Sequence, residues 1–149
     1  MDSRAEQKKL EYCQILMNKV NTPGQFPDYV RCRLTRLTPD GEAEGVLEVS
    51  PSVLNVWGTV HGGALSTLAD TVAGTGVAAA TGRGCVTVNY SMNYLHPATG
   101  GVITCTAHPA KLGNHICVMR TTLKNKKGDA VATGEFTFYV TTRLDKGVL

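Results

Sequence analysis

The chain has 149 residues, of which 42% are hydrophobic, and its formal net charge is +3. This length suits one globular domain with a core of its own and is too short for two. The basic residues are scattered and cluster only at Lys124, Lys126 and Lys127, so we do not expect a nucleic-acid partner, which would require a dense basic face or a stacking platform.

The cysteines point to a reducing compartment. There are five of them, an odd number without a CxxC motif, at Cys13, Cys32, Cys85, Cys105 and Cys117. We interpret them as reduced core thiols, and we predict no metal site because His and Cys lack the spacing of metal ligands.

The first 20 residues contain no long apolar run, so we expect neither a signal peptide nor a membrane span. The expected location is the cytoplasm, with the mitochondrion as the alternative.

The chain begins with a predicted amphipathic helix. Apolar side chains recur there at roughly helical spacing, and turn residues follow at 21–24 (Leu10, Cys13, Ile15, Leu16, Met17, Val20). We place this helix within residues 1–22. The core of the single domain, 1–149, then spans about residues 28–142.

The rest of the chain predicts an α+β fold. Alternating apolar residues on either side of Pro39-Asp40-Gly41 indicate a hairpin, and a long helix follows within residues 55–82. Four further segments with β character follow, separated by turns at 96–98, 113–114 and 127–129. Since no crossover helices lie between them, we expect one antiparallel sheet of about six strands against the long helix.

The long helix contains a single carboxylate. Between Glu48 and Arg83 the only ionisable side chains are His61 and Asp70, which predicts a helix that is buried nearly all round. One stripe should face the sheet (Leu65, Leu68, Ala69, Val72), and small residues occupy the other side (Gly63, Ser66, Thr67, Asp70, Gly74). A second copy of the chain, packed helix beside helix about a two-fold axis, would cover that second side.

The His61-Gly62-Gly63 triplet should lie at the N-terminus of this helix. Free backbone N–H groups and the helix dipole favour negative charge there, so we predict an oxyanion site. Asp70 lies eight residues after Gly62, or about 12 Å along the helix. The two cannot act on one carbonyl group within one subunit, whereas antiparallel helices of two subunits could bring them together.

The run from Asn55 to Asp70, NVWGTVHGGALSTLAD, resembles the active-site signature of hotdog-fold thioesterases of the PaaI-like group, which includes the acyl-CoA thioesterase 13 (thioesterase superfamily member 2) type. The segments VTVNYSMNYLHPA and GEFTFYV resemble the next strand and the final strand of that family. The likeness covers about residues 30–142. It implies a hotdog fold, with an antiparallel sheet wrapped around one long helix and active sites at the interface of a homodimer or a dimer of dimers.

The resemblance also implies roles for individual residues. Asp70 corresponds to the carboxylate that activates water or attacks the thioester, and Gly62 to the backbone donor to the thioester carbonyl. Asn55 and His61 match residues that orient the substrate and the donor loop. Thr87 stands where the family has a serine that helps to hold the water; threonine keeps the hydroxyl and adds a methyl group.

Substrate contacts are expected at two further places. The turn that borders the pantetheine path in the family contains Lys111, Gly113, Asn114 and His115, and Gly63 adjoins the donor. The lysines at 124–127 are a second candidate contact for the phosphates. For the acyl tail we expect apolar side chains such as Leu65, Val77 and Tyr94. No separate cofactor is expected, because coenzyme A is part of the substrate.

The predicted function is hydrolysis of acyl-CoA, with a place in lipid metabolism. Without a GxSxG motif a serine hydrolase mechanism is not expected. Another hotdog acyl-thioester enzyme and a non-catalytic acyl-CoA or acyl-carrier binding module are the alternatives. Structural interpretations also remain: a solvated Asp70, His61 as a helix cap, Asn55 as a turn residue and Thr87 as an ordinary strand residue.

Overall fold

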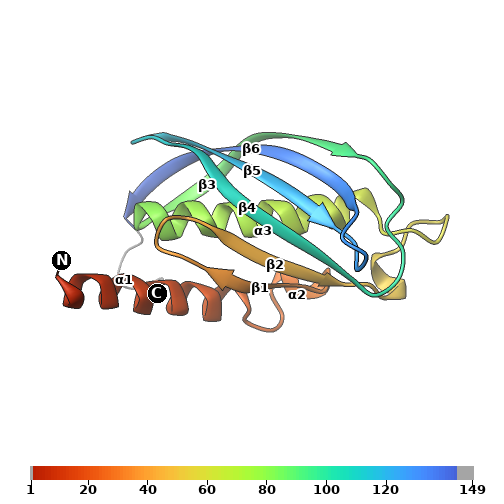
Figure 1. The fold of residues 1–149 in the computed structure, drawn as a ribbon, viewed down its shortest axis with the longest axis horizontal. Coiled ribbons are helices and arrows are strands. Elements are labelled where there is room, and N and C mark those ends of the chain that lie inside the picture. Colours follow the sequence, from red (N-terminus) through yellow and green to blue (C-terminus); the bar gives the residue numbers. More distant parts are fainter. Residues whose placement is uncertain (1, 144–149) are drawn as a thin grey trace.

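A computed structural model describes residues 2–143 of the chain. Six strands form one antiparallel sheet in the order β1-β2-β4-β5-β6-β3, which curves around the long helix α3 (Figure 1). The strands are β1 Cys32–Leu37, β2 Ala43–Glu48, β3 Arg83–Tyr94, β4 Val102–Leu112, β5 Ile116–Lys124 and β6 Ala130–Arg143. The helices are α1 Ser3–Val20, α2 Phe26–Tyr29, the short 3₁₀ helix η1 Pro51–Val53 and α3 Gly62–Thr81. The predicted α+β architecture is confirmed, and it is the hotdog arrangement.

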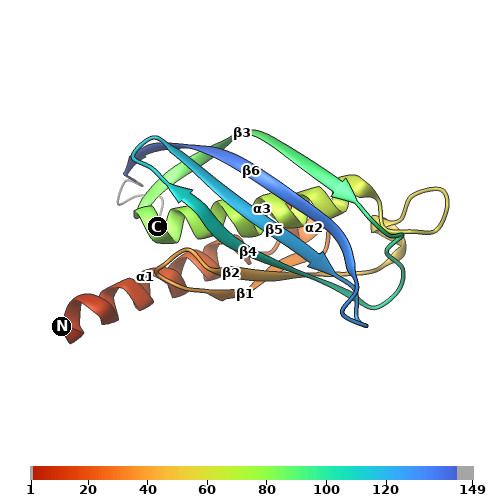
Figure 2. The same ribbon diagram turned by 45° about the horizontal axis from the view of Figure 1, so that its top comes forward.

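The N-terminal helix α1 lies outside the sheet and packs against β1 and α3 (Figure 2). Asp2 caps it by accepting a hydrogen bond from the backbone N–H of Arg4 at 3.2 Å. Cys13 and Leu16 are buried, but Leu10 is 54% exposed and Ile15 is also exposed. The buried stripe of α1 is therefore narrower than the apolar spacing predicted.

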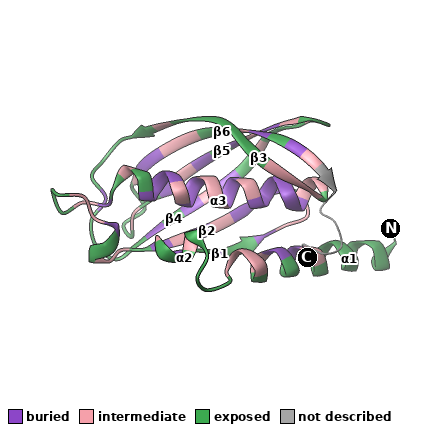
Figure 3. Ribbon diagram, turned by 180° about the vertical axis from the view of Figure 1, so that it is seen from behind, coloured by how far each residue is buried: buried purple, intermediate pink, exposed green. Residues whose placement is uncertain are grey.

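Helix α3 forms the centre of the core (Figure 3). Its predicted sheet-facing residues, Leu65, Leu68, Ala69 and Val72, are all buried. On the other side Thr67, Asp70 and Gly74 are half-buried and Gly63 is exposed, while Ser66 is buried against that expectation. The helix ends where Gly82 takes a left-handed conformation with φ 66°. One face of α3 thus remains open, and Asp70 lies on it.

Strand β3 is the edge of the sheet beside this open face. Within residues 2–143 it pairs with β6 alone, so its other side presents free backbone groups. Most of its side chains are exposed, including those of Val86, Val88 and Tyr90. An apolar edge strand of this kind is a surface suited to pairing with another strand.

Within the described part of the chain, no helix combines the length and the apolar composition that a bilayer crossing requires.

Candidate active site

The first turn of α3 presents a free backbone donor. His61 caps the helix, and its Nδ1 accepts a hydrogen bond from the Gly63 N–H at 2.8 Å. Gly62 is the first helical residue, and its N–H donates to no group among residues 2–143. The predicted position of the triplet is therefore confirmed, and the cap interpretation of His61 is correct. An acceptor such as an oxyanion could bind at the Gly62 N–H.

Tyr94 fixes the same turn from the end of β3. Its hydroxyl donates to the Gly62 carbonyl oxygen at 3.0 Å, and its ring covers the α-carbon, since a methyl group on Gly62 would lie 3.3 Å from two ring carbons. From the sequence Tyr94 was expected at the acyl tail, and its contact with Gly62 was not predicted. The only signal in the sequence was a tyrosine close before the turn predicted at 96–98.

Asn55 organises the loop that leads to α3. Its Oδ1 accepts from the backbone N–H groups of Trp57 and Thr59 at 2.9 and 3.1 Å, and its Nδ2 donates to the Thr59 hydroxyl at 2.8 Å. This confirms the interpretation of Asn55 as a turn residue. Asn55 and Thr59 also line a hollow of about 330 Å³ together with Gly62, Leu65 and Tyr94. We call it the Gly62 hollow.

The only carboxylate of α3 is held by a strand residue. Thr87 on β3 donates its hydroxyl hydrogen to Asp70 Oδ1 at 2.7 Å, which orients the carboxylate. Asp70 and Thr87 line a second hollow of about 350 Å³, bounded also by α1, α2 and β6. We call it the Asp70 hollow. The structure thus brings together the two residues for which the family resemblance implied a shared water.

The two hollows are separate. No residue lines both of them, and Asp70 lies eight residues after Gly62, or about 12 Å along α3. The separation of Gly62 and Asp70 predicted from the sequence is therefore present within one chain. A single carbonyl group cannot contact the Gly62 N–H and the Asp70 carboxylate of the same molecule.

Comparison with known proteins places this arrangement in a family. Residues 57–132, which include the start of α3, Asp70 and Thr87, match the profile of the Thioesterase superfamily. The chain belongs to the thioesterase superfamily. The resemblance of the Asn55–Asp70 run to thioesterases is confirmed at this level.

Solved structures of other proteins are similar to this superfamily member over most of its length. A hypothetical thioesterase of Streptococcus pneumoniae, solved with coenzyme A, is 32% identical, with a TM-score of 0.70 over 75% of this chain and 90% of that one. A Streptococcus mutans protein bound to acetyl-CoA is 29% identical, with a TM-score of 0.70 over 74% and 88%. PaaI of Escherichia coli is 20% identical and shares the fold, with a TM-score of 0.80 over 93% and 96%.

In this thioesterase-superfamily chain the turn at 111–115 lies far from the Gly62 hollow. Asn114 accepts a hydrogen bond from Arg83 at 3.0 Å through its backbone oxygen, and His115 stacks on Tyr139. Arg83 lies two residues after the end of α3, whose 20 residues span about 30 Å. Gly63 therefore does not form one site with Lys111, Gly113, Asn114 and His115 of the same chain.

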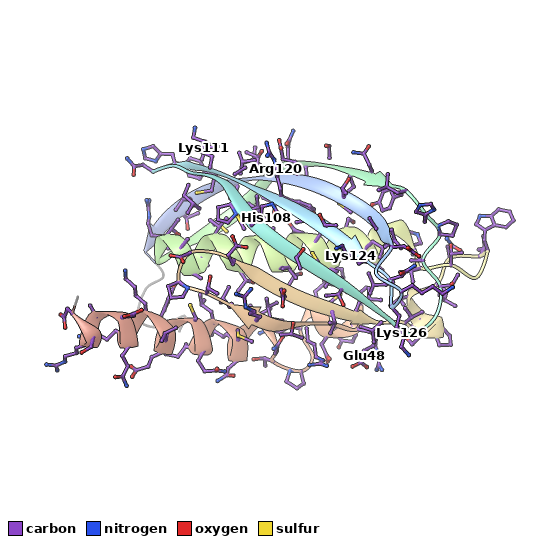
Figure 4. All side chains as sticks on the ribbon, viewed as in Figure 1. Glu48, His108, Lys111, Arg120, Lys124 and Lys126 are labelled. Carbon is purple, nitrogen blue, oxygen red and sulfur yellow. The ribbon has the colours of Figure 1, made fainter. Side chains whose placement is uncertain are left out.

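The two lysine groups also lie apart. Figure 4 shows Lys111 at one end of the molecule and Lys126 at the other. Lys126 lies near Gly101, where an added methyl group would be 3.4 Å from its Cδ. Lys111 and the 124–127 lysines of one chain cannot bind the same phosphates.

One expectation about the acyl tail is wrong. Val77 is 0% exposed and belongs to the buried hydrophobic core. Its side chain is not accessible to a substrate tail. Leu65 and Tyr94 line the Gly62 hollow instead.

The thiol nearest to Asp70 is not a candidate nucleophile. Cys85 lines the Asp70 hollow and its Sγ donates to the Gly74 carbonyl at 3.4 Å. Burial, followed by the neighbouring Cys117 and Asp70, raises the pKa of Cys85 to about 12. The thiol is therefore protonated at neutral pH and unreactive. All five cysteines are free, as predicted.

Proposed function

We propose that this chain is an acyl-CoA thioesterase that hydrolyses the thioester to a free acid and coenzyme A. The observation that carries the proposal is the Asp70–Thr87 pair, a carboxylate oriented by a hydroxyl at 2.7 Å on the open face of α3. Family membership supports acyl-thioester hydrolysis in general. The similar Streptococcus proteins bound to coenzyme A and acetyl-CoA favour coenzyme A esters as the substrates.

The proposed site combines Asp70 of one protomer with Gly62 of its partner. Strand β3 has a free edge with Val88 58% exposed, and the loop before α3 projects Trp57, which is 84% exposed. Antiparallel pairing of two β3 edges about a two-fold axis would cover these apolar side chains. It would also place two α3 helices side by side in opposite directions. The symmetry creates two equivalent sites, each with one Asp70 and one Gly62 N–H.

The chemistry follows from these groups. Asp70 takes a proton from a water molecule whose oxygen attacks the thioester carbon, and the oxyanion that forms accepts a hydrogen bond from the partner's Gly62 N–H. The C–S bond then breaks, and the sulfur of coenzyme A leaves with the proton that Asp70 holds. In the alternative route the Asp70 carboxylate attacks the thioester carbon directly and displaces coenzyme A, and water then hydrolyses the mixed anhydride. This route uses the same two protein groups, Asp70 and the partner's Gly62 N–H.

The test is the release of free thiol from acetyl-CoA and octanoyl-CoA by wild type and Asp70→Asn. We expect kcat of the variant to fall about 100-fold to 10,000-fold, because asparagine cannot act as a base. Binding of coenzyme A, measured by calorimetry, should be unchanged. Equal slow rates in the two proteins would contradict the proposal. Tight binding of acyl-CoA without turnover in wild type would favour the non-catalytic binding module.

A further inference from the structure

The Asp70 hollow is a groove that follows α3 away from the carboxylate. Asp70, Gly74 and Ala78 are four residues apart, so they lie one above the other on successive turns, over about 12 Å. Thr71 and Thr75 lie beside them on the same face. The hollow is therefore elongated, with Asp70 at one end and Ala78 at the other.

The walls of the groove come from elements on both sides of α3. Leu16 and Val20 of α1 and Pro27 of α2 form one side, and Cys85 of β3 and Phe138 of β6 form the other. Gly74 leaves space in the groove that a larger residue would fill, because a methyl group there would lie 3.2 Å from the Phe138 ring. The groove is narrow at this point.

Most lining residues are apolar, and the polar ones besides Asp70 are Gln25, Thr71, Thr75, Cys85 and Thr87. The Cys85 thiol donates to the Gly74 carbonyl at 3.4 Å, and the Thr75 hydroxyl donates to the Thr71 carbonyl at 2.7 Å. Both donors are thus satisfied within the protein. A raised pKa keeps Cys85 uncharged at neutral pH. The transfer of an aliphatic chain from water to this surface would therefore cost little free energy.

We propose that this groove binds the aliphatic tail of the acyl group, and that Val20 and Ala78 set the preferred chain length. The inference rests on the proposed function, which places the thioester carbon at Asp70. From there the tail runs along α3, between α1 and β3, towards Ala78. About 12 Å of helix suits a medium-length tail such as octanoyl, and acetyl would leave the groove empty.

Part of this subsite lies outside the segment that matches the family. Leu16, Val20 and Pro27 precede residues 57–132, whereas Asp70, Gly74, Ala78 and Thr87 lie within them. The Asp70–Thr87 pair and Cys85 of the opposite wall thus come from the matched segment, whereas Phe138 of that wall follows it. The wall formed by α1 and α2 belongs to the N-terminal segment, so chain-length preference can differ between superfamily members that share the catalytic pair.

The test compares octanoyl-CoA with acetyl-CoA in Val20→Phe, which narrows the groove, and Ala78→Leu, which closes its far end. We expect kcat/KM for octanoyl-CoA to fall about tenfold or more in each, with kcat/KM for acetyl-CoA retained, since one methylene in an apolar pocket changes discrimination by about 10-fold to 200-fold. Ile15→Phe is the matched control: Ile15 is exposed on the same helix and does not line the groove. It should leave both substrates unchanged.

A binding arm separates failure of this inference from failure of the proposed function. S-octyl-CoA is a thioether that cannot be hydrolysed. We expect it to bind wild type at least about tenfold more tightly than coenzyme A does. In Val20→Phe we expect S-octyl-CoA and coenzyme A to bind equally tightly. An unchanged octanoyl to acetyl ratio in both groove variants, or a preference for phenylacetyl-CoA over octanoyl-CoA, would overturn the inference. If wild type hydrolyses no acyl-CoA but still binds S-octyl-CoA more tightly than coenzyme A, the proposed function alone would be overturned. If Ala78→Leu does not fold, Val20→Phe and S-octyl-CoA still decide.

Discussion

At the scale of single residues, three hydrogen bonds define the candidate chemistry. Thr87 orients Asp70 from the neighbouring strand, and His61 and Tyr94 hold the turn in which the Gly62 N–H remains free. Each contact links residues whose individual roles look ordinary: a strand threonine, a helix cap and a tyrosine. What makes them a candidate site is that one orients the carboxylate on the open face of α3 and the other two fix the first turn of the same helix.

Thr87→Val should lower kcat about 10-fold to 100-fold, because a hydrogen bond to a charged group contributes about 1.5–3 kcal/mol. Valine has nearly the shape of threonine, so the strand should be retained and KM should change little. Thr87→Ser restores the hydroxyl and should recover most of the activity. Steady-state kinetics with octanoyl-CoA measure this. Full activity in the valine variant would show that the contact does not serve catalysis.

Gly62→Pro tests the proposed oxyanion donor, because proline has no N–H. Proline is well tolerated at the first position of a helix, and the His61 backbone, at φ −60° and ψ 133°, suits a residue that precedes proline. We expect kcat to fall about 100-fold to 1000-fold. Gly62→Ala adds a similar contact with the Tyr94 ring and keeps the N–H, so it should retain most of the activity. Equal losses in the two variants would assign the effect to the ring contact instead.

At the scale of elements, close packing between α3 and the sheet sets where the site lies. The turn between β1 and β2 lies against the C-terminal half of α3, and a methyl group at Gly76 would be 2.5 Å from the Gly41 carbonyl oxygen and 2.9 Å from Met119 Cε. The two glycines allow this approach. The sheet can therefore curve around α3 on one side and leave the Asp70 side open.

Gly76→Ala should destabilise the fold by about 1–3 kcal/mol, because overpacking at a backbone contact outweighs the better helix propensity of alanine. Urea unfolding followed by circular dichroism measures the free energy of unfolding. Gly62→Ala serves as the comparison on the same helix, since its neighbour is the half-exposed Tyr94 ring. A Gly76→Ala protein as stable as wild type would mean that the hairpin is free to move away from α3.

At the scale of the whole molecule, the separation of the two hollows makes one chain insufficient for the proposed reaction. Gly62 and Asp70, which line the two hollows, lie about 12 Å apart along α3, and the hollows share no lining residue. Both lie beside β3, the edge strand whose exposed apolar side chains suit pairing with a second copy. A two-fold symmetric dimer would join one hollow of each type at each site.

Mixed dimers of Asp70→Asn and Gly62→Pro test this directly. In a mixed dimer one site carries both changes and the other carries neither, so random assembly should recover about a quarter of wild-type activity. Each variant alone should be nearly inactive. Co-expression with two affinity tags isolates the mixed dimer, and sedimentation checks its size. No recovery in a verified mixed dimer would mean that each site is built from one chain.

The sequence by itself determined the order of the elements, the antiparallel sheet, the helix start at His61-Gly62-Gly63 and the isolation of Asp70, because periodicity, capping and turn chemistry are local properties. The family resemblance supplied Thr87. Only the tertiary structure decided that Tyr94 covers Gly62, that Val77 is in the core, that the 111–115 turn is remote from Gly63, and that α1 walls the groove beside Asp70. The physical reason is that these contacts join residues far apart in the chain. Local patterns predict which face of an element is apolar, but not which element packs against it.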